Sequence, residues 1–351
     1  AGHSPDLVQV VTGYAETGAA LVDSVDKVFF TGSTAIGRKV AEAAAKRLIP
    51  CVLELGGKDP FIICRDANLD TIVQILLRGV YQNAGQNCIA VERIFVPVDM
   101  LESLLHRTVP LVQAIRQGDD RGETSDMGAM TMGTTAIQHI QGLIDDAVSK
   151  GAKVHVGGKA NDALPGGTYY LPTVVSGVTT SMRIAQEEVF GPVMTIFTYR
   201  DEQDLLRQVN CCPFALGSSI YSRNVEQALC LSRQVNAGMC NINDFGINYL
   251  CQSLPFGGMK DSGYDRFAGP EGLRGCCHVK SVTIDRFRWI GTTIPRPLAY
   301  PIAENGWAFF QELVALFYGS GLLSKVDNVR NLTLMTILRK WKPRAVGGGW
   351  I

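Results

Sequence analysis

The strongest constraint on the fold is the alternation of apolar, strand-like runs with longer, charged, helix-like segments through the first third of the chain. The strand-like runs are 7–11, 25–30, 51–55, 61–64 and 93–96, and the helix-like segments are 35–48, 70–82 and 101–115. This rhythm predicts an α/β fold in which helices cover parallel sheets, because parallel strands need a crossover connection.

Length and charge narrow the functional classes. A chain of 351 residues favours two domains or one large α/β unit. Lys plus Arg equals Asp plus Glu at 33 each, so no basic field is available for nucleic acid, which we do not expect as a partner. The ten cysteines include two adjacent pairs and have no zinc-site spacing, so we expect reduced thiols and no metal.

The last seventy residues differ from the rest in composition. Residues 280–287 alternate apolar and charged side chains, which predicts a strand that could pair outside its own domain. Residues 307–323 are rich in aromatics and Leu but are too few and too interrupted by Glu to span a membrane. They predict an amphipathic helix that packs on its own protein or lies on a membrane surface. Residues 338–351 are a basic, Gly-rich tail.

Residues 31–37, Thr-Gly-Ser-Thr-Ala-Ile-Gly, lie between a predicted strand and a predicted helix. Backbone N–H groups and the helix dipole favour a phosphate at such a position. The same turn is also what ordinary helix capping requires, so the motif is ambiguous by itself.

The next segment of interest, residues 54–58, reads Glu-Leu-Gly-Gly-Lys and follows an apolar strand. Ligand clefts in open α/β sheets form at the carboxyl ends of strands, and paired glycines let the backbone approach a ligand closely. Glu54 could therefore activate water there. The alternative is a surface ion pair between Glu54 and Lys58.

Cys88 ends the polar sequence Asn-Ala-Gly-Gln-Asn-Cys. A lone cysteine usually serves as a small buried apolar residue, and Cys51, Cys64, Cys230 and Cys240 fit that role. Cys88 differs because the amides and backbone donors of Gln86 and Asn87 could stabilise a thiolate or an oxyanion.

Taken together, these three segments resemble the aldehyde dehydrogenase superfamily in content, order and spacing, with Cys88 placed 34 residues after Glu54. The resemblance covers the carboxy-terminal two thirds or so of that family. It implies that Cys88 is the nucleophile and that Glu54 is the base that frees a carboxylic acid. It also implies an incomplete Rossmann-like NAD(P)-binding domain and an aldehyde substrate.

Two later motifs extend the resemblance. Residues 187–193 resemble the family's segment in which Glu188 grips the nicotinamide ribose and Phe190 braces the ring. Residues 255–263 resemble its substrate-side loop. The residues that the resemblance assigns to the cofactor, NAD or NADP, are Thr31, Gly32, Ser33, Gly37, Gly56, Glu188 and Phe190. Those that it assigns to an apolar aldehyde tunnel are Tyr81, Phe245 and Phe256.

The implied domain boundaries are 1–56 for the remnant of the dinucleotide-binding domain, 57–255 for the catalytic domain, 256–287 for a closing segment with the oligomerisation strand, and 288–351 for an extension. Residues 281–287 resemble the family's pairing strand, which implies a homodimer or tetramer. The family's second oxyanion donor and its ribose-binding Lys and Glu lie upstream of the matched region, so we expect the chain alone to be inactive or unstable.

Residues 294–306 resemble the extension of the plant and algal family-22 aldehyde dehydrogenases and of the fungal meiotic sister-chromatid recombination aldehyde dehydrogenases. That resemblance implies the endoplasmic reticulum or another membrane-associated location, with the cytoplasm as the alternative. Two other functions stay open. One is an acylating or phosphate-linked semialdehyde dehydrogenase, and the other is a catalytically impaired fragment or membrane-associated scaffold of the same fold.

Overall fold

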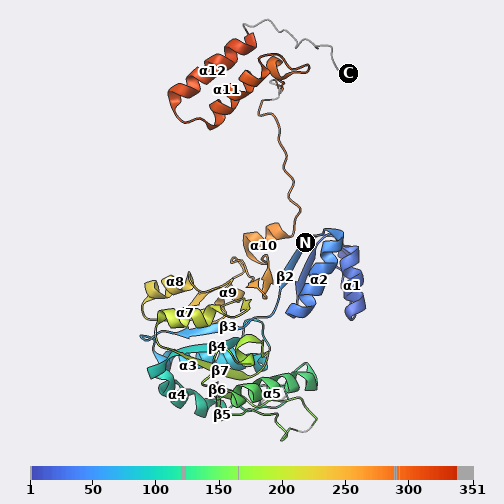
Figure 1. The fold of residues 1–351 in the computed structure, drawn as a ribbon. Coiled ribbons are helices and arrows are strands. Elements are labelled where there is room, and N and C mark those ends of the chain that lie inside the picture. The colour runs from blue at the N-terminus through green and yellow to red at the C-terminus, as the bar shows by residue number, and fades with distance from the viewer. Residues whose placement is uncertain are drawn as a thin grey trace, which may run out of the picture. The chain divides into compact units, whose positions relative to one another are not determined.

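The computed structural model describes residues 2–119, 124–164, 166–287, 289, 291 and 293–337. The chain divides into two compact units, Ala1–Val279 and Lys280–Ile351, and each packs as a body of its own. Figure 1 shows the chain coloured from blue at its N-terminus to red at its C-terminus.

A small three-stranded sheet lies at the start of the first unit (Figure 1). Its order is β1-β2-β12, in which β1 (Val28–Thr31) and β2 (Cys51–Glu54) are parallel and β12 (Gly263–Tyr264) is antiparallel to β2. Helices α1 (Ala15–Ser24) and α2 (Thr34–Arg47) pack on each other beside it. The predicted strand-helix-strand order is confirmed here.

The predicted strand at residues 7–11 is wrong. A short 3-10 helix, η1, covers Pro5–Leu7, and no strand follows it before α1. The side chains of Val8 and Val10 are 77% and 86% exposed. No described strand lies beside this run to accept its backbone hydrogen bonds, so apolar composition alone does not make it a strand.

A seven-stranded sheet forms the centre of the first unit, in the order β10-β9-β3-β4-β7-β6-β5. All neighbouring strands are parallel except the edge pair β5 and β6. Every residue of β3, β4 and β6 is buried, as expected for parallel strands covered on both faces. The strands are β3 (Asp59–Ile63), β4 (Val91–Pro97), β5 (Lys153–Val156), β6 (Thr173–Ser176), β7 (Val193–Tyr199), β9 (Ser219–Tyr221) and β10 (Asn241–Ile242).

Helices flank this sheet. Helices α3 and α4 pack against β4 to β7, and α7 and α8 pack against β7, β9 and β10. The predicted helices at 70–82 and 101–115 are confirmed as α3 and α4. The helices are α3 (Leu69–Tyr81), α4 (Leu101–Gln113), α5 (Gly133–Ser149), α6 (Arg183–Gln186), α7 (Glu202–Asn210), α8 (Val225–Ser232), α9 (Ile247–Leu250) and α10 (Gly269–Gly275). The short 3-10 helices η2 (Gln82–Gly85) and η3 (Val98–Met100) and the hairpin of β8 (Phe214–Ala215) with β11 (Met259–Lys260) complete the unit.

The two sheets are joined by a very short connection. Only residues 55–58 separate the carboxyl end of β2 from the amino end of β3. Later in the chain, β12 returns to pair with β2, and Gly263 lies opposite Glu54. The carboxyl end of β2 in the first sheet therefore lies next to the amino end of β3 in the second sheet. This junction holds the site described below.

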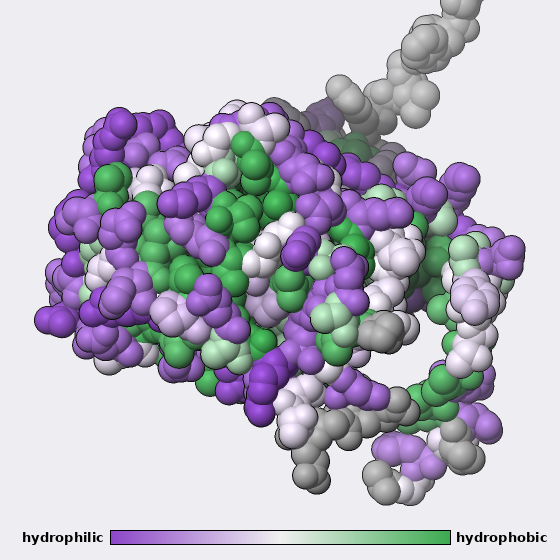
Figure 2. Space-filling view, turned by 90° about the horizontal axis from the view of Figure 1, so that it is seen from below, coloured by the Kyte–Doolittle hydropathy of each residue, from purple (hydrophilic) through white to green (hydrophobic). Residues whose placement is uncertain are grey.

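The view from below shows the side of the first unit on which β5 ends the large sheet (Figure 2). Hydrophobic groups gather in the middle of this face, with hydrophilic groups around them. Apolar atoms contribute more than half of ordinary protein surfaces, so this face by itself assigns no partner.

The second unit contains η4 (Arg296–Leu298) and two helices, α11 (Gly306–Tyr318) and α12 (Leu322–Ile337), which pack together. The single helix expected at 307–323 is thus two helices, because the chain turns at Gly319–Gly321. Among the described residues no helix is long and apolar enough to cross a membrane. Residues 281–287 form no strand within this chain, and the predicted basic tail at 338–351 lies outside the described residues.

Candidate active site

The turn before Cys88 has an unusual backbone. After α3, three consecutive residues take left-handed conformations, with φ values of 54° at Asn83, 57° at Ala84 and 72° at Gly85. At Gly85 a Cβ would lie 2.2 Å from the carbonyl oxygen of Gly191, so only glycine fits against that loop. Such conformations cost free energy and persist where surrounding contacts hold them.

The side chain of Gln86 supplies those contacts. Its amide nitrogen donates to the carbonyls of Asn83 and Ala129, and its amide oxygen accepts from the backbone N–H and the hydroxyl of Thr131. This amide is therefore committed to the turn, and the sequence-based expectation that it stabilises a thiolate or an oxyanion is wrong. Gln86 fixes the position of Cys88 instead.

Cys88 is half-buried at the end of this turn, with its Sγ atom 3.7 Å from Oδ1 of Asn87. The pKa of the Cys88 thiol is raised to about 11. Burial is the largest cause, and the negative charges of Asp59 and Glu188 contribute to the rise. Among the described residues, the backbone N–H of Cys88 has no hydrogen-bond acceptor. That N–H is therefore not committed to another backbone group.

Glu54 is the last residue of β2, and its side chain is buried. Neither carboxyl oxygen has a hydrogen-bond partner among the described residues. Burial raises the pKa of this carboxyl to about 8, which the charge of Arg266 opposes and that of Asp265 reinforces. The alternative of a surface ion pair with Lys58 is wrong, since Lys58 is buried and pairs with Glu92.

Cys88 and Glu54 both lie beside two segments of the chain, Gly56–Gly57 and Phe256–Gly257. Gly57 approaches the Cys88 backbone so closely that a Cβ would lie 2.1 Å from the Cys88 carbonyl oxygen. Phe256 packs in the apolar cluster that contacts Cys88, and a Cβ on the adjacent Gly257 would lie 2.8 Å from Oε1 of Glu54. The structure thus brings the thiol and the carboxyl to one site between these segments.

Glu188 lies on a loop that reaches the same glycines. Its Oε1 atom accepts a hydrogen bond from the backbone N–H of Gly57 at 3.1 Å, and a Cβ on Gly56 would lie 2.4 Å from its Oε2. Burial raises the pKa of Glu188 to about 8, and the charge of Glu92 adds to the shift. Phe190 follows in a left-handed conformation with φ of 48°.

The Thr31–Gly32–Ser33 segment lies next to Glu54. Thr31 pairs with Glu54 across β1 and β2, and the N–H of Gly32 donates to the Glu54 carbonyl. Ser33 is the N-cap residue of α2, but its hydroxyl makes no capping hydrogen bond and is exposed. The Ser33 hydroxyl therefore does not cap α2.

Gly37 differs from the expectation that it contacts the cofactor. It is buried on the inner side of α2, where a Cβ would lie 2.5 Å from a methyl carbon of Leu55. Its role is to let α2 pack closely on the chain that leaves β2.

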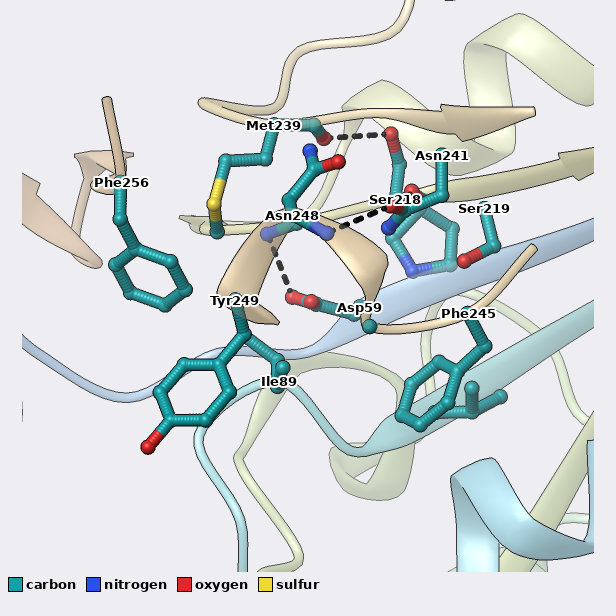
Figure 3. A pocket seen from close by; sticks show the side chains of 14 residues that line it. Asp59, Ile89, Ser218, Ser219, Met239, Asn241, Phe245, Asn248, Tyr249 and Phe256 are labelled. Atoms are coloured by element: carbon teal, nitrogen blue, oxygen red, sulfur yellow. Dashed lines mark hydrogen bonds between the residues drawn. The ribbon is translucent and has the colours of Figure 1, made fainter. Parts of the chain in front are cut away.

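A narrow pocket lies beside the Cys88 turn, and Phe245 and Phe256 line it from opposite sides (Figure 3). Ile89 and Tyr249 also line it, and its volume of about 10 Å³ holds roughly one water molecule. Tyr81 does not belong to this lining. Its buried hydroxyl donates to the carbonyl of Thr173, which corrects the prediction that it lines an aldehyde tunnel.

A wider groove of about 540 Å³ adjoins this pocket and shares Ile89, Phe245 and Tyr249 with it. Its walls come from α3 and α9, and it also reaches Asn87, next to Cys88. The apolar side chains of Ile75, Ile247 and Leu250 line the groove together with polar side chains such as those of Gln74 and Arg78. A groove of this size accommodates an organic molecule, while the narrow pocket does not.

Sequence analysis missed the burial and the partners of three charged residues at the site. Asp59 accepts a hydrogen bond from the N–H of Gly217, and burial raises its pKa to about 7. Lys58 pairs with Glu92, which also accepts backbone hydrogen bonds from the loop after Glu188. Charged residues inside a strand that is apolar elsewhere, Glu92 and Arg93 in β4, were the available signal.

The chain is similar to known proteins in sequence and in fold. Residues 1–282 match the aldehyde dehydrogenase family. The chain is 40% identical over 337 residues to an aldehyde dehydrogenase-like protein of Schizosaccharomyces pombe, a match that covers 94% of this chain and 64% of that protein. It is 37% identical over 314 residues to another from Saccharomyces cerevisiae, covering 87% of this chain and 48% of that protein.

Among solved structures, the chain is similar to betaine aldehyde dehydrogenase of Staphylococcus aureus in complex with NAD+. The TM-score is 0.70 at 34% identity, and the match covers 74% of this chain and 51% of that one. The chain thus spans about half to two thirds of the length of the relatives that it matches.

Proposed function

Because the chain belongs to the aldehyde dehydrogenase family, we propose that it carries the catalytic part of an enzyme that oxidises an aldehyde to a carboxylic acid with NAD or NADP. The observation that carries this proposal is the meeting of two reactive groups at one site. Glu54 is a buried carboxyl without hydrogen-bond partners among the described residues, and it lies next to Gly257. Cys88, whose backbone N–H makes no backbone hydrogen bond, lies next to Gly57.

The first step is attack by the Cys88 sulfur on the aldehyde carbon, which forms a C–S bond and moves an electron pair onto the carbonyl oxygen. The backbone N–H of Cys88 stabilises that oxyanion. The thiol must lose its proton to solvent during the attack, since its pKa is about 11. As the carbonyl re-forms, hydride leaves the carbon and a thioester remains on Cys88. The nicotinamide ring, when bound, accepts that hydride.

The second step is hydrolysis. Glu54 takes a proton from a water molecule, whose oxygen attacks the thioester carbon, and the C–S bond breaks. The acid leaves, and the sulfur is free for the next aldehyde. With a pKa of about 8, the Glu54 carboxylate is a stronger base than an ordinary glutamate. Its unpartnered oxygens leave room for water as a partner.

The residues around the junction fit NAD or NADP. Gly32 and the free hydroxyl of Ser33 border the start of α2, which suits the pyrophosphate, and Thr31 flanks the nicotinamide. Gly56 leaves the space beside the Glu188 carboxylate that a Cβ would fill. In this proposal Glu188 binds the nicotinamide ribose, Phe190 braces the ring and Gly56 flanks it.

The groove between α3 and α9 is the proposed route for the aldehyde. It reaches the residues on either side of Cys88, and Phe245 lines both it and the narrow pocket against Phe256. Apolar side chains on both walls favour an alkyl or aromatic aldehyde over a small charged one.

Trapping the thioester tests this function. Glu54→Gln in the full-length protein should release one equivalent of reduced cofactor and then stall, with an acyl group on Cys88 detected by mass spectrometry. Cys88→Ser should show neither signal. If Glu54→Gln turns over like the wild type once coenzyme A or phosphate is added, the enzyme is acylating and the hydrolytic proposal fails.

We further propose that the second unit lies on a membrane surface, at the endoplasmic reticulum or another membrane. Large apolar side chains of α11 and α12 face solvent, among them Trp307, Phe317, Leu322 and Leu323, each at least 68% exposed. Sedimentation with phosphatidylserine-containing vesicles should carry the protein down, and Trp307→Ser with Phe317→Ser should abolish this. A protein that stays in the supernatant would overturn the proposal of a membrane surface.

A further inference from the structure

A buried ion pair lies directly behind the loop that carries Glu188. Nζ of Lys58 is 2.7 Å from Oε2 of Glu92, and the two side chains are 0% and 4% exposed. Among the ion pairs of the described residues, it is the one with both partners buried. Lys58 follows Gly57 at the sheet junction, and Glu92 is the second residue of β4.

The Glu92 carboxylate has further partners. It accepts hydrogen bonds from the backbone N–H of Val189, at 2.9 Å and 3.1 Å to its two oxygens, and from that of Phe190 at 2.8 Å. The left-handed conformation of Phe190 belongs to this turn. Without the carboxylate, two N–H groups at a largely buried position would lose their acceptor.

Stability alone does not explain this arrangement. Removing two charges from water costs more than an apolar pair of the same volume would, and such pairs are often replaced without loss of stability. An apolar pair could not accept the two backbone hydrogen bonds. The arrangement therefore serves the position of the turn, and Lys58 keeps the acceptor charged inside the protein.

Two connections join the Gly57–Lys58 segment to the loop of residues 188–190. Gly57 donates to Glu188, while the neighbouring Lys58 binds Glu92, which holds Val189 and Phe190. These two connections fix the distance between Glu188 and the Gly56–Gly57 turn. Glu188 makes no ion pair among the described residues, and its backbone carbonyl oxygen also lies 2.9 Å from Nε2 of His139.

We propose that Glu92 is a positioning residue for the cofactor: through Lys58 and the 189–190 backbone it holds Glu188 and Phe190 in the geometry that binds the nicotinamide end of NAD(P). This inference rests on the proposed function, because that function assigns Glu188 and Phe190 to the cofactor. It adds two residues, Lys58 and Glu92, that do not themselves touch the cofactor.

Cofactor binding measured without turnover tests the inference. We would titrate the full-length protein with NADH and NADPH and follow their fluorescence. Glu92→Leu should weaken the binding that the wild type shows by about tenfold or more, because the backbone N–H groups of Val189 and Phe190 lose their acceptor. The double variant Lys58→Met with Glu92→Leu removes the unpaired buried charge, so it should fold stably yet bind as weakly.

Glu187→Gln is the matched control. Glu187 adjoins Glu188 but pairs with Arg183 on the surface, so its loss should leave the dissociation constant within about twofold. In the double variant the midpoint of thermal unfolding should match that of the wild type. The alkylation rate of Cys88 without cofactor should stay within about twofold of the wild-type rate. These two measurements separate a displaced turn from a damaged fold.

The outcomes distinguish this inference from the function on which it rests. Wild-type affinity for NAD(P)H in the double variant would overturn the positioning role while leaving the proposed function intact. A wild-type protein that binds neither NADH nor NADPH would overturn the proposed function, and the inference with it. Weak binding in the double variant, with the control unaffected, supports both.

Discussion

At the scale of single residues, the site is defined by carboxyl groups held away from water. Glu54, Asp59 and Glu188 all have raised pKa values, and in each case burial is the largest cause. A buried carboxyl that stays neutral near pH 7 can hold a proton and release it when a partner arrives. The same low-dielectric surroundings raise the pKa of Cys88, so neither reactive group is charged by default in this structure.

The raised pKa of Glu54 makes stability depend on pH. The group titrates near 4.5 when unfolded and near 8 in the fold, so its proton favours the folded state. This contribution is complete below pH 4.5 and is lost as pH rises through about 8. Glu54→Gln should therefore melt about 2 to 4 °C above the wild type at pH 9. Differential scanning fluorimetry should show the two curves converging near pH 4, and a gap that persists there contradicts the assignment.

The charge of Glu188 should restrain the reactivity of Cys88. Because this negative charge raises the thiol pKa, Glu188→Gln should lower it and give more thiolate at a fixed pH. We expect alkylation of Cys88 by iodoacetamide at pH 9 to accelerate roughly 2- to 5-fold, a shift of about half a pKa unit. Mass spectrometry of the Cys88 peptide gives the rate apart from other thiols. An unchanged rate in Glu188→Gln would remove Glu188 from the electrostatics of the thiol.

At the scale of elements, the close approach of two loops decides where the nucleophile lies. The Gly56–Gly57 turn after β2 and the turn after α3 contact each other at Gly57 and Cys88. Sequence periodicity predicted α3 and β4 well, because each has an apolar face that must be buried. It could not predict the left-handed turn between them, since that turn is held by Gln86 contacts with Ala129 and Thr131, more than 40 residues away.

Filling that close approach should separate the two reactive groups. In Gly57→Ala the new Cβ would lie 2.1 Å from the Cys88 carbonyl oxygen, which is backbone and must move. We expect loss of thioester formation and about 1 to 3 kcal/mol of destabilisation, from quenched-flow mass spectrometry and urea unfolding. Gly18→Ala is the control. It lies in α1 with nothing within 4 Å, so it should stabilise the protein by about 0.5 to 1 kcal/mol. Full activity in Gly57→Ala would show that the contact is not needed.

At the scale of the whole molecule, the second unit begins with an exposed segment that has the pattern of a strand. Val282 and Ile284 are 72% and 87% exposed, and residues 281–287 pair with no strand of this chain. The exposed apolar side chains of Val282 and Ile284, which alternate along the segment, favour pairing with a sheet of a second copy. We propose a homodimer or tetramer formed through this segment.

Charge placed on the apolar side of that strand should break the assembly. Val282→Glu with Ile284→Glu should shift the full-length protein to the mass of a monomer in light scattering, since two charges would be buried at the interface. The same variant should be cut faster by trypsin after Lys280 and Arg286. Thr283→Glu places a charge on the opposite side and should leave both measurements unchanged. A wild-type protein that is monomeric at all concentrations rules the interface out.

The sequence by itself determined the fold class and the order of most helices and strands, and it pointed to Cys88 and Glu54 as the proposed reactive pair, because these depend on periodicity and on motif spacing along the chain. Only the tertiary structure decided which side chains share the cleft. It removed Tyr81 from the pocket lining and Gly37 from the cofactor contacts, and it turned the Gln86 amide to the backbone. It also revealed Lys58, Asp59 and Glu92, whose roles come from burial beside partners far along the chain, and no local pattern records which partner a buried charge will meet.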